Sequence, residues 1–227
     1  GKPVVLVLFT GRPLILNWEQ DNVPAILNVW FGGSEAAYAI GDVLFGRVNP
    51  SGKLTMSFPQ NVGQIPLYYA HKNTGRPLHD GKWFEKFRSN YLDVTNEPLY
   101  PFGFGLSYTT FAYSDISLSQ SSMDMQGMIT ASVDVSNTGL LPGGEVVQLY
   151  IRDLVGSTTR PVKELKGFRK VKLAPGEEQK VSFTVAKDAL SFFDDAKHEW
   201  IAEPGKFEAV IAASAADIRG VVPFELR

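Results

Sequence analysis

The chain opens with two stretches of unbroken apolar character. Residues 4–9 (VVLVLF) contain no polar side chain, and residues 23–31 (VPAILNVWF) have nearly the same composition. Apolar runs without alternation are typical of strands that are buried on both faces of a parallel sheet. The 13 residues between the runs leave room for the crossover that parallel strands need. The pattern therefore predicts an α/β unit.

A helical period follows in residues 35–45. Its apolar stripe consists of Ala36, Ala37, Ile40, Val43 and Leu44. Positions spaced by three and four predict an amphipathic helix. We expect Ser34 to cap this helix, Glu35 to lie in its first turn, where a carboxylate is favourable, and Gly46 to end it.

Turn residues and a short alternation complete this first region. The sequence NPSG at 49–52 is typical of a turn, and Leu54, Met56 and Phe58 then alternate with polar residues. This alternation predicts a strand with one buried face, which Pro59 ends. We expect the first domain, of α/β type, to cover residues 1–69.

Periodicity is lost in residues 70–110, which are rich in aromatic side chains and finish with YPFGFGLSY at 100–108. A structureless stretch of this length is uncommon inside a compact domain. We interpret it as an interdomain linker, and its aromatic density favours packing on a surface over free flexibility.

Residues 111–227 have a period of two. Apolar and polar side chains alternate in six segments, at 129–135, 147–151, 171–173, 181–185, 207–211 and 222–226. Pro, Gly and Asn turns separate them. About seven short alternating strands predict an all-β domain in which two sheets pack face to face.

Composition narrows the class of protein. Apolar residues are 44% of the sequence and charged residues 20%, as in soluble globular proteins. A net charge of −2 gives no positive excess for nucleic acid, and no apolar run approaches the roughly 20 residues that cross a bilayer. The absence of cysteine excludes disulfides and thiolate chemistry. Because the first strand has no sheet neighbours ahead of it, we also expect sequence before Gly1.

Nine segments, in order along the chain, together resemble glycoside hydrolase family 3. They are KPVVLVL (2–8), TGRP (10–13), WFGGSE (30–35), DVLFG (42–46), NPSGKL (49–54), SFP (57–59), YPFGFGLSY (100–108), GEVVQLY (144–150) and KELKGF (163–168). The resemblance covers essentially the whole chain. A further segment, YYAHKNTGRP at 68–77, is more narrowly similar to the bacterial periplasmic β-glucosidase branch.

The resemblance implies the last part of a three-domain enzyme. A TIM-type barrel and the start of the α/β sandwich domain would precede this chain, and residues 111–227 would form a fibronectin type III-like, immunoglobulin-like sandwich. It implies a retaining, exo-acting β-glucosidase, periplasmic or secreted, that needs no cofactor. The Asp nucleophile and the Glu acid/base are expected upstream of Gly1, so we assign no catalytic residue within this chain.

The linker is where substrate contacts are most expected, because loops on rigid scaffolds commonly supply binding residues. His71, Asn73, Arg76 and Trp83 are candidates for the rim of an active site, in the same or a neighbouring subunit. The alternative is that they only dock the linker on its own domains. Trp30 offers an aromatic face to a sugar ring, with core packing as its alternative.

Other residues with reactive side chains have simpler explanations. Glu35 follows a strand end where open α/β sheets bind ligands, but a first-turn position in a helix accounts for it. His71, His79 and His198 lack metal-ligand spacing, so no metal is expected. The GFG at 103–105 lacks the third glycine of a dinucleotide fingerprint and predicts a tight aromatic turn into the sandwich.

Two alternative functions stay open at this point. One is a β-xylosidase of the same family, because the subsite residues that choose the sugar are expected on the barrel. The other is a non-catalytic carbohydrate-binding or interaction module, which has no need of the α/β portion. The expected partners are an oligosaccharide or β-glucoside substrate and the upstream barrel, with a homodimer left open and with neither nucleic acid nor membrane insertion.

Overall fold

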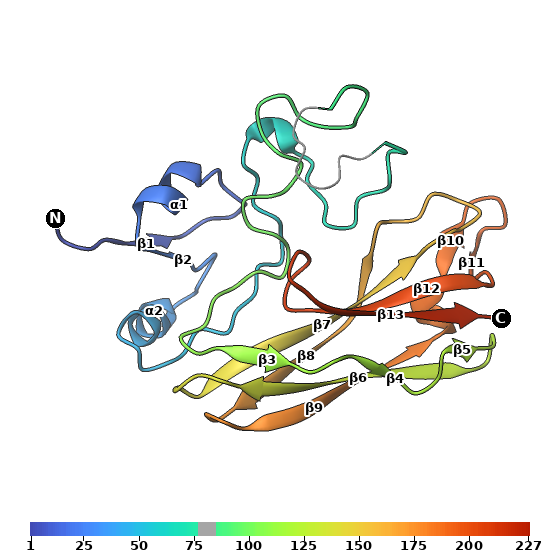
Figure 1. The fold of residues 1–227 in the computed structure, drawn as a ribbon. Helices are drawn as coiled ribbons and strands as arrows, with labels where there is room; N and C mark the ends of the chain where they lie inside the picture. The colour runs from blue at the N-terminus through green and yellow to red at the C-terminus, as the bar shows by residue number, and fades with distance from the viewer. Residues whose placement is uncertain (77–84) are drawn as a thin grey trace.

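Two parallel strands open the fold, in a computed structural model that describes residues 1–76 and 85–227. Strand β1 (Val5–Leu8) pairs in parallel with β2 (Ala25–Asn28), and helix α1 (Asn17–Asn22) lies in the crossover between them. This α/β part lies beside the sandwich, with the two chain termini on opposite sides of the molecule (Figure 1). The predicted fold class, α/β followed by an all-β sandwich, is confirmed.

Helix α2 (Ala36–Leu44) follows the second strand as predicted, but its N-terminus differs from the expectation. Glu35, and not Ser34, occupies the N-cap position, and no side chain caps the helix. The C-terminus is as predicted: Gly46 has φ 72° and donates its N–H to the Val43 carbonyl. A positive φ at the end of a helix suits glycine because it has no Cβ.

The strand predicted from Leu54, Met56 and Phe58 does not form. This segment makes a single isolated bridge, between Phe58 and Tyr100, and Met56 is half exposed. Its backbone pairs irregularly with the linker, as where Leu54 N donates to the Phe104 carbonyl. A partner segment that contains proline and glycines cannot extend a regular ladder, so the alternation reflects burial of two side chains instead of a strand.

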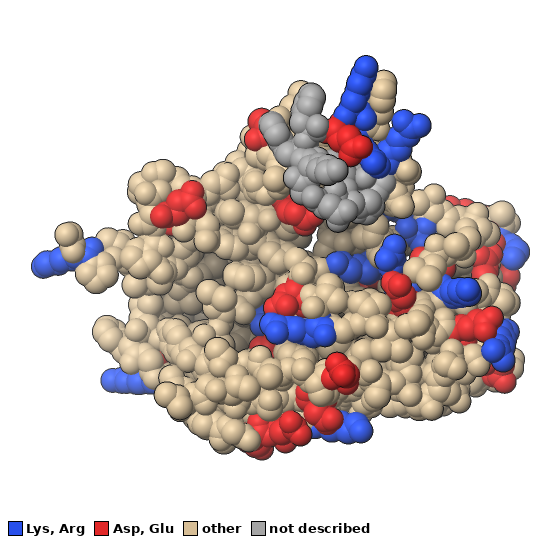
Figure 2. Space-filling view, viewed as in Figure 1, with Lys and Arg blue, Asp and Glu red and all other residues tan. Residues whose placement is uncertain are grey.

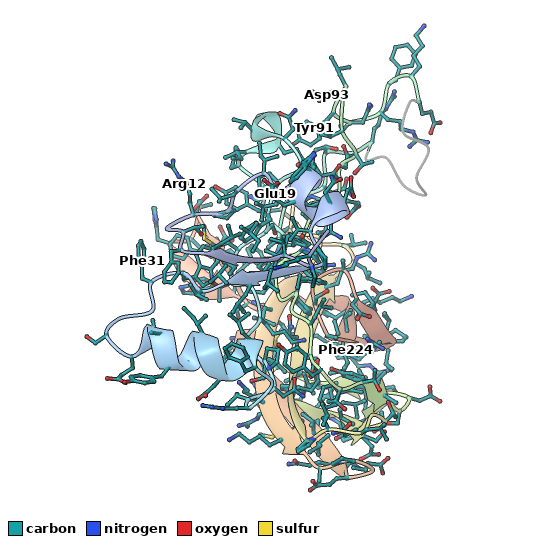
Figure 3. The ribbon with its side chains drawn as sticks, turned by 90° about the vertical axis from the view of Figure 1, so that its left-hand side faces the viewer. Arg12, Glu19, Phe31, Tyr91, Asp93 and Phe224 are labelled. Atoms are coloured by element: carbon teal, nitrogen blue, oxygen red, sulfur yellow. The ribbon has the colours of Figure 1, made fainter. Side chains whose placement is uncertain are left out.

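A short 3₁₀ helix, η1 (Val62–Gln64), then anchors the returning linker. The buried Gln64 side chain accepts from Gln60 N at 2.6 Å and donates to the carbonyls of Thr95 at 2.9 Å and Glu97 at 3.1 Å. Tyr91 donates its hydroxyl to the Gln64 carbonyl, and it lies near the top of the side view with Asp93 (Figure 3). The part of the linker that contains Tyr91, Thr95 and Glu97 is therefore packed on η1, as the aromatic density of the segment predicts.

The sandwich consists of two antiparallel-rich sheets. Its strands are β3 (Phe111–Tyr113), β4 (Ser117–Leu118), β5 (Ser122–Met123), β6 (Met128–Asn137), β7 (Gly143–Asp153), β8 (Glu164–Leu173), β9 (Glu178–Ala186), β12 (Gly205–Ala212) and β13 (Ile218–Leu226). One sheet has the order β5-β13-β12-β7-β8, and in the other β6 pairs with β3, β4 and β9. Helix α3 (Lys187–Leu190) follows β9.

Alternate side chains of these strands fill the core, as the period of two predicts. Val133, Phe183, Phe207 and Phe224 are all buried between the sheets. Phe207 and Phe224 stack with ring centroids 5.7 Å apart, and Phe224 lies within the sandwich in Figure 3. A hairpin of β10 (Phe192–Asp194) and β11 (Glu199–Ile201) was not predicted, because its strands are too short to show a period.

Hydrogen bonds from Asn49 hold the α/β part on the sandwich. The Asn49 side-chain oxygen accepts from Ser107 Oγ at 2.9 Å and from Tyr108 N at 2.8 Å. Its amide nitrogen donates to the Pro142 carbonyl at 3.0 Å. One residue of the predicted NPSG turn thus contacts both the end of the linker and the turn before β7.

A buried ion pair makes the second contact between the two parts. Lys53 Nζ lies 3.3 Å from a Glu145 carboxylate oxygen and donates to the Gly105 carbonyl at 3.1 Å. Tyr113 donates its hydroxyl to the same carboxylate at 3.0 Å, and burial beside it raises the Tyr113 pKa. The α/β part, the linker and both sheets therefore meet at one carboxylate.

Candidate functional site

A groove of about 450 Å³ lies between the linker and the outer face of the β12 and β13 strands. Its lining includes Tyr68, His71, Asn73, Glu97, Arg152 and Lys163. The end of the α/β part and the linker supply one wall and the sandwich supplies the other, so the groove exists only because the linker returns across the sheet. Another hollow, of about 340 Å³, is lined chiefly by residues 152–162.

Aromatic rings form the floor of the groove. Tyr69 stacks on Phe102 with centroids 4.3 Å apart and meets the buried Tyr150 edge to face at 5.8 Å. Tyr150 donates its hydroxyl to Gln148 Oε1 at 2.6 Å, and burial raises its pKa. The Tyr69 hydroxyl accepts from Leu165 N at 3.2 Å. Because each buried hydroxyl has a partner, this floor is rigid.

Lys163 places an ammonium at the edge of that floor. Its Nζ donates to the Ala215 carbonyl and lies 6.0 Å from the centre of the Tyr150 ring. Burial lowers the pKa of Lys163, the charge of Glu97 opposes this shift and that of Arg152 adds to it. The site therefore holds a partly desolvated amine close to an acceptor of opposite charge.

Both signs of charge occur around the groove. Arg152 pairs with Glu208 at 3.4 Å, and the Glu97 carboxylate lies on the linker side, opposite Lys163. Figure 2 shows basic and acidic side chains interspersed on this face, without a large patch of one sign. The groove is thus polar at its rim and close to neutral.

Two of the linker residues expected at a substrate site line this groove. His71 is exposed, and its carbonyl accepts from Val162 N at 2.9 Å, which ties the linker to the loop before β8. The Asn73 side chain accepts from Gly75 N at 2.8 Å. Arg76 is exposed and lies outside the groove lining, whereas Trp83 falls outside the described residues.

Trp30 lies elsewhere, after β2, and does not line the groove. Its φ is 50°, and its ring centroid is 5.9 Å from that of the buried Phe58. Glu35 is exposed at the start of α2. The structure therefore separates these two residues from the linker candidates.

Asp153 and Glu164 are two carboxyl groups bound to the same guanidinium, that of Arg160. Retaining glycosidases need two carboxyl groups about 5 to 5.5 Å apart, one of them with a raised pKa. Burial raises the Asp153 pKa, but Arg160 binds Asp153 at 3.2 Å and Glu164 at 3.0 Å. One guanidinium binds both carboxylates, so this cluster holds the loop between β7 and β8.

Within 1–76 and 85–227, no group of three or more His, Asp or Glu side chains is arranged to hold a metal ion. The helices of the same residues are too short and too polar to cross a bilayer.

The sequence did not identify Lys163, Glu97, Arg152 or Tyr68 as groove residues. Tyr68 and Lys163 stand in two of the segments that carry the family resemblance, which was the available signal. Neither segment has a spacing that predicts contact with the other, because the groove is assembled from stretches far apart in the chain.

Comparison with known families gives two matches along the chain. Residues 1–108 match the glycosyl hydrolase family 3 C-terminal domain, and residues 145–215 match the fibronectin type III-like domain. The "Periplasmic beta-glucosidase" of Salmonella typhimurium is 52% identical over 96% of this chain, and a "Beta-xylosidase" of Formosa agariphila is 46% identical over 95%. The chain spans about 28% of the length of each relative.

Two solved structures share the fold of this chain. The beta-glucosidase from Listeria innocua, in complex with isofagomine, has a TM-score of 0.94 and 43% identity over all of this chain and 31% of its own. The beta-glucosidase from Kluyveromyces marxianus, in complex with glucose, has a TM-score of 0.79 and 36% identity over 98% of this chain and 26% of its own.

Proposed function

The chain belongs to glycoside hydrolase family 3, and from this premise we propose that the whole protein is a retaining, exo-acting β-glucosidase that removes terminal β-D-glucosyl residues from oligosaccharides. The observation that carries the proposal is the 52% identity over 96% of the chain to a protein named a periplasmic beta-glucosidase. The aligned region covers nearly the whole chain, so it takes in both domains and the linker.

The catalytic carboxyl pair lies outside this chain in our proposal. Its support is that Arg160 binds both Asp153 and Glu164, so these two carboxylates are already engaged within the chain. The chain also spans only about 28% of its relatives, which leaves room for a barrel with the nucleophile and for the acid/base residue.

This segment acts as scaffold and as part of the substrate-binding rim. His71 and Asn73 line the groove, and with Arg76, Trp83 and Trp30 they are our candidates for substrate contact. The division into residues 1–69, a linker of 70–110 and a sandwich of 111–227 belongs to the same proposal. It is supported by the start of β3 at Phe111.

Location and assembly complete the proposal. A periplasmic location is supported by the name of the Salmonella typhimurium relative. Sedimentation velocity on the full-length protein will decide whether it works as a monomer or a homodimer.

A β-xylosidase is the second candidate, favoured by the 46% identity to the Formosa agariphila protein. The two sugars differ by one hydroxymethyl group, which a subsite outside this chain would recognise. A free carbohydrate-binding module is the weaker alternative, because residues 1–108 match a domain of the enzyme family.

The test is hydrolysis of a panel of nitrophenyl glycosides by the full-length protein. The proposal expects kcat/KM for the β-glucoside to exceed that for the β-xyloside. The reverse order would establish the second candidate, and no turnover of any β-glycoside would remove both.

A further inference from the structure

The groove has the build of a small-molecule site. Ligand sites are concave, largely apolar in lining and fitted with a few polar groups that fix orientation. Here the stacked rings of Tyr69 and Phe102 form a rigid floor, and Val210 and Val221 extend it. The charged and amide side chains stand at the rim. A ligand with both an apolar face and many hydroxyl groups would match this division.

The charges at the rim select a neutral ligand. Lys163 and Arg152 are balanced by Glu97 and Glu208, all four of which line the groove. A phosphorylated or carboxylated ligand would meet two carboxylates as well as two cations. A hydroxyl group can donate to a carboxylate and accept from an ammonium, so a polyhydroxylated neutral molecule satisfies both signs at once.

Lys163 has hydrogen-bonding capacity to spare. Among the described residues, its Nζ makes one hydrogen bond, to the Ala215 carbonyl. An ammonium carries three donors, so two remain for acceptors in the groove. The Asn73 amide nitrogen adds further donors from the facing wall, because the intramolecular bond of Asn73 uses only the side-chain oxygen.

Tyr68 supplies the remaining element, an aromatic face beside the groove. Its side chain lines the groove and is 66% exposed, although the neighbouring Tyr69 is packed into the floor. An exposed tyrosine ring presents an apolar plane and a polar tip. The axial C–H groups of a pyranose ring pack against such a plane, and its equatorial hydroxyls point outward toward the rim.

We propose that this groove binds a neutral pyranose-containing oligosaccharide, with Tyr68 stacked on a sugar ring and with Lys163, Asn73 and Glu97 bonded to its hydroxyls. The choice of a glucose-based ligand rests on the proposed function, whereas the preference for a neutral saccharide rests on the groove itself.

Titration calorimetry on the full-length protein tests this proposal. The protein is first saturated with isofagomine, the compound bound in the Listeria innocua structure. Cellobiose and laminaribiose are then titrated, with glucose 6-phosphate as the anionic comparison. We expect binding of the neutral disaccharides and weaker binding of the phosphate ester.

Variants assign that binding to the groove. Tyr68→Ala and Lys163→Met are expected to weaken it by about tenfold or more. Tyr68→Phe keeps the ring and is expected to bind like the wild type. Trp200→Ala is the matched control, since Trp200 is 68% exposed and lies on β11 outside the groove. Because Tyr68 is exposed, its removal is not expected to unfold the protein.

Two results would overturn the proposal: no disaccharide binding to the isofagomine-saturated protein, or binding that Tyr68→Ala and Lys163→Met leave unchanged. Hydrolysis of nitrophenyl β-glucoside is measured in parallel. Activity without groove binding would refute this inference alone, and groove binding without activity would refute the proposed function alone.

Discussion

Gly103 turns the linker onto the sandwich in a backbone conformation that suits glycine. Its φ is 80°, and a Cβ built there would lie 2.3 Å from Gln148 Oε1. Gln148 cannot easily move away, because its amide nitrogen donates to the Ala213 carbonyl at 2.8 Å and its oxygen accepts from Tyr150. Backbone strain and a steric clash therefore coincide at this position.

We predict that Gly103→Ala destabilises the protein by about 2 to 4 kcal/mol, which the apparent Tm of the full-length protein will report. Gly52→Ala is the control, because a Cβ at Gly52 meets no atom within 4 Å and its φ is not positive. A Gly103→Ala Tm equal to that of the control would show that the turn relaxes without cost.

Lys163 gives a pH dependence whose sign follows from its lowered pKa. The folded protein binds fewer protons at this amine than the unfolded chain, whose ordinary value is 10.5. Below the lowered pKa, Lys163 is charged in the folded protein, and the full cost of burying that charge reduces stability. As pH rises from the lowered pKa to 10.5, the folded protein loses this proton and the cost disappears.

We predict that, as pH rises from 7 to 10.5, the Tm of Lys163→Met falls relative to the Tm of the wild type. The reason is that methionine removes a penalty that the wild type itself loses at high pH. Lys206→Met is the control, because Lys206 is exposed, and its Tm difference from the wild type is measured at the same pH values. A difference for Lys163→Met that stayed flat, or shifted in favour of the variant, would contradict the direction of the shift.

At the scale of elements, the irregular segment 49–58 is fixed to β7 by the ion pair of Lys53 and Glu145. The two side chains are 14% and 6% exposed, and Tyr113 on β3 bonds the same carboxylate. Removing one partner of a buried pair leaves an uncompensated charge, which costs more than the pair contributes. This contact therefore sets the junction between the α/β part and the sandwich.

We predict that Lys53→Met lowers stability by about 3 to 5 kcal/mol and that Lys53→Met combined with Glu145→Leu recovers part of the loss. Thermal unfolding of the wild type, both single variants and the double variant measures the coupling. Additive losses in the double variant would mean that the two side chains do not interact.

At the scale of the whole molecule, the α/β part exposes large apolar side chains. Phe31, which follows β2, is 86% exposed, and Phe45, at the C-terminal end of α2, is 84% exposed. Phe31 extends outward from that pair in the side view (Figure 3). Surfaces of this kind are normally covered by another part of the same protein or by a partner.

We predict that residues 1–227 expressed alone are poorly soluble and that co-expression with the upstream part of the gene product rescues them. Replacing Phe31 and Phe45 by lysine should raise the soluble yield of the segment, because it removes apolar surface. Leu140→Lys changes a 92% exposed side chain on the sandwich and should have little effect. A monodisperse, cooperatively unfolding wild-type segment would refute this prediction.

We also predict that purified residues 1–227 hydrolyse no aryl β-glucoside, because the proposed catalytic carboxyl pair lies outside this segment and Arg160 already binds both Asp153 and Glu164. The assay is nitrophenol release, with the full-length protein as the positive control. Turnover by the segment that disappeared in Asp153→Asn or Glu164→Gln would place the chemistry in this chain after all.

The sequence by itself determined the two parts of the fold and the core of the sandwich. Residues such as Val133 and Phe207 were predicted to face inward because side chains alternate between the two faces of a strand. This alternation is a local property of the backbone, so it can be read from the sequence. The parallel pair β1 and β2 was predictable from a second local pattern, the unbroken apolar runs that are typical of strands in a parallel sheet.

Only the tertiary structure decided where the linker lies and which residues form the groove. The alternation at 54–58 predicted a strand, but the proline and glycines of 100–105 prevented a ladder. Lys163 and Glu97 face each other because the linker returns over the sheet, and no local period encodes that path. Short-range sequence patterns reflect burial and backbone preference, whereas a binding surface built from distant segments depends on packing among all of them.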